Sequence, residues 1–116
     1  MSLDDSELSP GARILLADTK NDLFLSPASY WEIAIKISSG KYELNEQLDE
    51  FIRRELDSNN ISILPISPEH AAATISLPWH HRDPFDRLLI AQAVVENLTI
   101  ISKDRLFDAY PITRAW

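Results

Sequence analysis

Residues 83–104 read DPFDRLLIAQAVVENLTIISKD, and this stretch decides the fold and points to the chemistry. The Asp-Pro pair at its start predicts the cap and first turn of a helix that ends near residue 97. The apolar run at 98–102 predicts a strand, and Asp104 follows it almost directly. The stretch therefore places one carboxylate, Asp86, at the start of an apolar helix and another just after the next strand.

The composition is that of one ordinary globular domain spanning residues 1–116. The chain has no cysteine, which excludes disulfides, thiolate zinc sites and cysteine nucleophiles. It has no apolar run long enough for a bilayer and no signal-peptide pattern, so we expect a soluble cytoplasmic protein that does not bind a membrane. The net charge of −7 disfavours broad attraction to nucleic acid, although a metal ion held by acidic residues would reverse the local sign.

Helical and strand patterns alternate along the chain. Helices are predicted at residues 9–18, 28–38, 44–56, 67–77 and 84–97, strands at 23–26, 61–66, 98–102 and 112–116, and a helical turn at 104–110. This alternation predicts an α/β fold with a mostly parallel sheet covered on both faces. Right-handed crossovers then gather the carboxyl ends of the strands at one edge, where open α/β folds bind their ligands.

Three carboxylates are predicted to meet at this edge: Glu32, Asp86 and Asp104. Each also has a structural explanation. Glu32 and Lys36 form an i,i+4 pair in the favourable order, Asp86 lies where acids favour a helix start, and Asp104 could cap the turn that follows it. Asp86, however, shares an inward-facing stripe with Leu89, Ile90 and Ala93, which favours a functional role. Asp83 is explained by capping alone.

Other polar residues give weaker signals. The adjacent His80 and His81 cannot easily face one metal, and no third zinc ligand has a familiar spacing. With Trp79 and Arg82 they could instead contact RNA by stacking and phosphate pairing. No serine has a base at a recognisable spacing, so a serine-nucleophile mechanism has no support.

Three segments together resemble a known family. Residues 24–36 (FLSPASYWEIAIK) resemble the second acidic motif of PIN-domain proteins, residues 81–93 (HRDPFDRLLIAQA) the third and residues 101–107 (ISKDRLF) the fourth. Their order along the chain is that of the family. Within the family, the segments are most similar to the VapC-like toxins of bacterial toxin–antitoxin pairs.

The resemblance implies a PIN-like three-layer α/β/α fold and an endoribonuclease that uses Mg²⁺ or Mn²⁺ held by four acidic side chains. It implies that Glu32, Asp86 and Asp104 are catalytic and bind metal. It further implies auxiliary roles for Ser102 and Asp83, whereas the RNA-binding roles expected for His81 and Arg82 rest on the residue types of the loop. The partners implied are an RNA substrate, a cognate antitoxin and a second copy of the chain in a homodimer.

The resemblance departs from the family at the start of the chain. The family begins with a hydrophobic strand that ends in the first catalytic aspartate, followed by a helix, and this unit is expected to be missing here. Asp4 and Asp5 follow no strand and do not replace that aspartate. We therefore expect a truncated domain, a domain completed by strand exchange with a second copy or a partner, or a degenerate module that binds without cutting. A receiver-like phosphoacceptor domain ranks last, because it needs an aspartate that closes a central strand.

Overall fold

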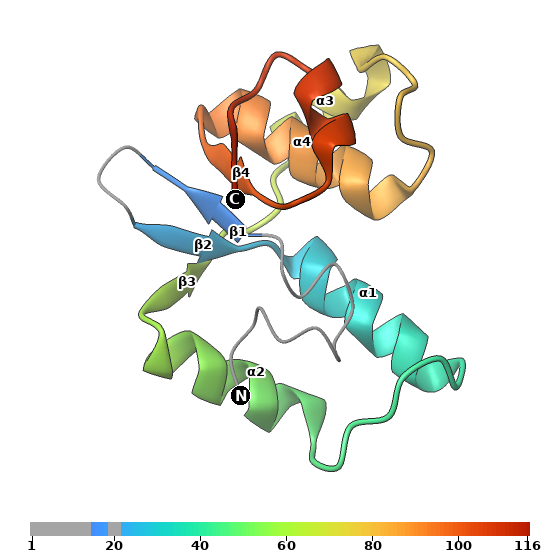
Figure 1. Ribbon diagram of the computed structural model, residues 1–116, viewed down its shortest axis with the longest axis vertical. Helices are drawn as coiled ribbons and strands as arrows, with labels where there is room; N and C mark the ends of the chain where they lie inside the picture. The colour runs from blue at the N-terminus through green and yellow to red at the C-terminus, as the bar shows by residue number, and fades with distance from the viewer. Residues whose placement is uncertain (1–14, 19–21) are drawn as a thin grey trace.

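The computed structural model describes residues 15–18 and 22–116 (Figure 1). Within these residues the strands are β1 (Leu15–Ala17), β2 (Leu23–Leu25), β3 (Ile61–Ile63), β4 (Thr99–Ile101) and β5 (Arg114–Ala115). The α-helices are α1 (Pro27–Ser38), α2 (Leu48–Ser58), α3 (Pro68–Ala73) and α4 (Pro84–Glu96), and two 3₁₀ helices are η2 (Thr74–Ser76) and η3 (Arg105–Ala109). Among the described residues, no helix has the length and apolar character needed to cross a membrane.

The sheet has the strand order β3-β2-β1-β4-β5 and is mixed. The pairs β2–β3 and β4–β5 are parallel, whereas β1 is antiparallel to both of its neighbours. Four strands therefore run in one direction and β1 opposes them. The sheet is thus mostly parallel in strand direction, as predicted, and the carboxyl ends of β2, β3, β4 and β5 meet at one edge.

The central strand β1 overturns the helix predicted at residues 9–18. Leu15, Leu16 and Ala17 form a strand that pairs with β2 on one side and β4 on the other. A short apolar run fits a helix or a strand equally well, and here the open edges of two neighbouring strands decide its conformation. The Ser-Pro start of the predicted helix lies outside the described residues, as do Asp4 and Asp5.

Each face of the sheet has its own hydrophobic core. On one face, Leu25 and Ile61 pack with Ile33 of α1 and with Phe51 and Ile52 of α2. On the other face, the buried cluster comprises Leu16, Leu89, Ile90, Ala93, Ile100, Phe107 and Tyr110. Neighbouring residues of β1 thus serve opposite faces, as the period of a strand requires. The result is the predicted three-layer α/β/α architecture, with α1 and α2 below the sheet and α3 and α4 above it in the view of Figure 1.

The remaining elements agree with the sequence pattern except at their ends. The helix predicted at 44–56 is α2 and begins four residues later, and the strand predicted at 61–66 ends at Ile63, shortly before Pro65. The helix predicted at 67–77 is divided between α3 and η2, and the strand predicted at 112–116 is confined to Arg114–Ala115. These differences leave the edge that carries Glu32, Asp86 and Asp104 unchanged.

Candidate functional site

Glu32 is held on the buried side of α1, directly after β2. The helix begins at Pro27 because Ser26 caps it, with its hydroxyl accepting the backbone N–H of Ala28 at 3.1 Å. Glu32 is only 7% exposed, and its carboxylate lies 3.0 Å from the ammonium of Lys36, which confirms the predicted i,i+4 pair. Burial would lower the pKa of Lys36, but the bond to Glu32 outweighs it and the pKa is raised.

Asp86 enters the same region from the start of α4. Asp83 caps this helix as predicted, accepting the backbone N–H groups of Phe85 at 2.7 Å and Asp86 at 3.4 Å. The ring of Phe85 contacts that of Trp31 edge-on, with the centroids 5.5 Å apart, and this contact joins the starts of α1 and α4. Glu32 and Asp86 each follow a ring of this pair by one residue, and the charge of Glu32 acts on Asp86.

The half-buried carboxylate of Asp86 accepts no hydrogen bond from the part of the chain that the structure describes. Burial raises its pKa, and so do the negative charges of Asp83, Glu32 and Asp104, whereas His81 acts in the opposite direction; the result is a pKa of about 6. Carboxylates from three separate segments of the chain therefore share one electrostatic neighbourhood.

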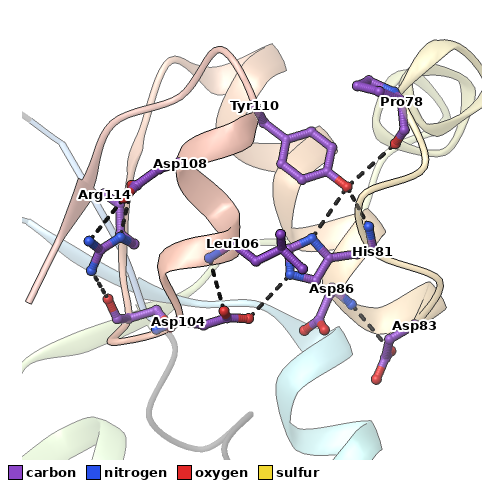
Figure 2. Close-up of polar contacts among 10 residues, drawn as sticks. Pro78, His81, Asp83, Asp86, Asp104, Leu106, Asp108, Tyr110 and Arg114 are labelled. Carbon is purple, nitrogen blue, oxygen red and sulfur yellow. Dashed lines mark hydrogen bonds and ion pairs between the residues drawn. The ribbon is translucent and has the colours of Figure 1, made fainter.

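Asp104 follows β4 and begins η3. One carboxylate oxygen accepts the backbone N–H of Leu106 at 3.0 Å, so the predicted capping role is confirmed. The other lies 3.2 Å from Nε2 of His81. The buried Ser102 is close to this position, because its hydroxyl accepts the backbone N–H of Asp104 at 3.1 Å. Figure 2 shows Asp86 below the ring of His81, between Asp104 and Asp83.

His81 and Arg82 lie in different environments although they are adjacent. His81 is 6% exposed, and its ring stacks on Phe107 with centroids 4.6 Å apart, which removes it from direct reach of a large ligand. Arg82 is exposed and lines an open hollow together with Trp79. Of the two residues predicted to contact RNA, Arg82 is the exposed one.

Sequence reasoning missed Arg87 and Tyr110. Arg87 is buried and donates to the carbonyl oxygens of Thr74, Leu77, Pro78 and His81. The hydroxyl of Tyr110 accepts the backbone N–H of His81 at 2.8 Å. The position of Arg87 among the apolar residues of a predicted helix is a sequence signal that it could be buried. No pattern in the sequence marks Tyr110.

The oxygen ligands at this edge suit a hard divalent cation. Positive charge there would relieve the mutual repulsion that raises the pKa of Asp86. As the side chains lie, however, the described residues contain no group of three or more acidic, histidine or cysteine side chains arranged to hold a metal ion. Glu32 is bound to Lys36, and Asp104 to His81. The carboxylate oxygens are thus ligands of the right type for such a cation, but these side chains are not arranged around a common point.

Comparison with known proteins agrees with this arrangement. The family model described as PIN domain matches residues 2–112, which is nearly the whole chain. No curated protein and no solved structure gives a significant match. With its three-layer fold and its acidic residues gathered at one sheet edge, the chain belongs to the PIN-domain family, whose fold is of the nuclease type.

Proposed function

We propose that this protein is an endoribonuclease dependent on Mg²⁺ or Mn²⁺, resembling the toxin of a toxin–antitoxin pair. The observation that carries the proposal is the position of Asp86, whose unbonded, half-buried carboxylate lies within the electrostatic reach of Glu32 and Asp104. Gathering like charges raises the energy of the folded protein unless a cation offsets them. Family membership supports the same activity.

Glu32, Asp86 and Asp104 are the residues that would hold the cation. A divalent cation at such a site stabilises negative charge and lowers the pKa of bound water. The hydroxyl of Ser102 accepts the backbone N–H of Asp104 and so orients that residue. Asp83 caps the first turn of α4, on which Asp86 lies. Lys36 balances the charge of Glu32 across their 3.0 Å contact.

The RNA contact of this proposal is assigned to the open hollow near the start of α4 that Trp79, Arg82 and Pro84 line. Arg82 provides positive charge, and Trp79 is 72% exposed. The guanidinium of Arg87 lies 3.7 Å from the centroid of the Trp79 ring, and this cation–π contact holds the ring in position. Exposed aromatic rings stack on unpaired bases, and arginine pairs with phosphate. These contacts offset the net charge of −7, which otherwise opposes RNA binding.

Cleavage of a single-stranded RNA tests the proposal. The protein should cut the RNA with Mg²⁺ or Mn²⁺ and lose this activity on addition of a chelator. Asp86→Asn removes one negative ligand and should lower the rate by about a hundredfold or more. Asp57→Asn changes an exposed acid on α2 and is the matched control, expected to cleave normally. Cleavage by Asp86→Asn at the full rate would refute the role of Asp86.

The alternative function is a catalytically impaired module that binds an antitoxin or a second copy of itself. Two side-chain contacts favour this alternative, because Glu32 is bound to Lys36 and Asp104 to His81. Among the described residues, no group of three or more side chains is therefore arranged to bind a metal ion. Titration with Mn²⁺ separates the two functions, because only the nuclease should bind it at millimolar concentration. Absence of binding would favour the module.

The toxin role adds two partners and a location to the proposal. A cognate antitoxin would inhibit the nuclease, the chain would form a homodimer, and both would act in the cytoplasm. The two partners can be tested by measuring the molar mass in solution, alone and after co-expression with the product of the neighbouring gene. A strict monomer under all conditions would contradict both.

A further inference from the structure

We infer that His81 is a positioning residue that holds the carboxylate of Asp104 for the acidic site. The inference rests on the proposed function, since it assigns His81 to the cation site formed by Glu32, Asp86 and Asp104. It replaces the RNA contact expected for His81, because the ring is buried and faces Asp104.

The ring of His81 contacts Phe107 and Tyr110, and Arg87 binds the backbone of the same residue. One face stacks on Phe107 with the ring planes 22° apart. The hydroxyl of Tyr110 accepts the backbone N–H of His81 at 2.8 Å and lies 3.3 Å from Nδ1. Arg87 donates to the His81 carbonyl oxygen at 3.4 Å. These contacts fix the orientation of the ring, so Nε2 stays directed at Asp104.

The hydrogen-bonding capacities of the groups assign the direction of each bond. An ionised carboxylate only accepts, so Nε2 of His81 donates to Asp104 across 3.2 Å. Nδ1 then lies 3.3 Å from the hydroxyl of Tyr110, whose single proton can be donated either to Nδ1 or to the carbonyl oxygen of Pro78. Figure 2 shows this chain of contacts from Pro78 through Tyr110 and His81 to Asp104. Both oxygens of Asp104 are thereby occupied, one by Leu106 and the other by His81.

Stability alone does not account for this arrangement. The side chain of Asp104 is 48% exposed, and a bond to so exposed a carboxylate contributes little to folding. Orientation of a metal ligand by a second residue, by contrast, commonly changes metal affinity by about 10–100-fold. A buried ring donor that is restrained by Phe107 and Tyr110 and directed at a half-exposed acid therefore suits a positioning role.

Two substitutions at His81 test the inference. The amide nitrogen of Gln reaches about as far as Nε2 of His, whereas that of Asn reaches only as far as Nδ1. His81→Gln therefore keeps a donor for Asp104, and His81→Asn loses it. Both lose the ring stacked on Phe107, so any purely structural damage should be similar. Mn²⁺ affinity is measured by the loss of the free-ion electron paramagnetic resonance signal, with the melting temperature of each variant recorded.

His81→Asn should weaken Mn²⁺ binding by about tenfold, and His81→Gln should stay close to the wild-type protein. Equal loss in both variants, or no loss in either, would overturn the inference while leaving the proposed function intact. If the wild-type protein itself binds no Mn²⁺, the proposed function fails and the inference fails with it. Asp86→Asn identifies the site, because it should abolish the binding that is being compared.

Tyr110→Phe provides a second route if the His81 variants do not fold. It keeps the buried ring of Tyr110 and removes only the hydroxyl that contacts His81. The imidazole ring then loses one of its restraints, and Mn²⁺ binding should weaken. Unchanged binding in this variant would overturn the inference.

Discussion

At the scale of single residues, Asp86 differs from the other acids at the site. Glu32 has an ammonium partner, Asp104 has a backbone N–H and an imidazole, and Asp83 caps a helix. Asp86 has none of these partners within the described chain and lies half-buried among them. Its ionisation is therefore unfavourable for folding, and this cost can be measured.

We predict that Asp86→Asn stabilises the protein at neutral pH but not at acidic pH. The folded-state pKa is raised from 3.8 to about 6, so between these values the folded protein keeps a proton that the unfolded chain has lost. Raising the pH through this window lowers the free energy of unfolding of the wild-type protein, by at most about 3 kcal/mol. Asn has no proton to lose, so the variant should gain up to that amount over the wild type at pH 7.5 and little at pH 4.

Urea denaturation of both proteins at the two pH values gives the comparison. Because every other acid is common to both, the difference between the proteins isolates Asp86. Asp57→Asn is again the control and should show no such pH-dependent difference. A gain of the same size at pH 4 and pH 7.5 would contradict the raised pKa.

At the scale of elements, one helix start organises two parts of the site. Asp86 points toward the acids, and the next residue, Arg87, points toward the segment from η2 to His81. The guanidinium donates to four carbonyl oxygens there, with distances from 2.8 to 3.4 Å. The segment has no regular structure between Leu77 and Asp83, so its shape depends on side-chain contacts, and Arg87 makes more of them than Tyr110 does.

We predict that Arg87→Lys destabilises the protein by about 2 kcal/mol and loosens residues 77–82. An ammonium keeps the charge but cannot reach four acceptors with the planar fork of arginine. Faster amide hydrogen exchange should be confined to this segment, including His81, and the fluorescence of Trp79 should change because its ring rests on Arg87. The exposed Arg53→Lys on α2 is the matched control and should change stability by less than about 0.5 kcal/mol. Equal stability of the two variants would show that Arg87 does not hold the segment.

At the scale of the whole molecule, β1 joins the two halves of the sheet. It lies between β2 and β4, and Leu16 is fully buried in the core that contains α4. Without β1, the strands that lead to Glu32 and to Asp104 would not share one sheet. The site thus depends on a strand that carries none of its residues.

We predict that Leu16→Ala lowers the free energy of unfolding by about 2–5 kcal/mol, the range for removing a leucine from a packed core. Leu15→Ala is the matched control, because Leu15 is only partly buried and should cost less. Denaturant titration of both variants measures the difference. A larger loss for Leu15 would contradict the deeper burial of Leu16.

Local pattern determined a large part of this protein. The caps at Asp83 and Asp104, the apolar stripe of α4 and the alternation of elements are sufficient to predict three carboxylates at one sheet edge. These features depend on residues within a few positions of one another, which is the range over which periodicity and capping act. The resemblance of the three acidic segments to the PIN-domain family is also a local feature of the sequence, and the family match agrees with it.

Tertiary structure alone decided the rest. Residues 15–17 are a strand because the edge of β2, which follows closely in sequence, and the edge of β4, which is distant in sequence, require a partner between them. His81 faces Asp104 because Phe107, Tyr110 and Arg87 converge on it from other elements. Such contacts join residues that are 6 to 29 positions apart, and no local pattern encodes them. The sequence therefore determined which acids lie at the carboxyl edge of the sheet, and only the packed structure decided which strand joins the two halves of that sheet and what each acid contacts.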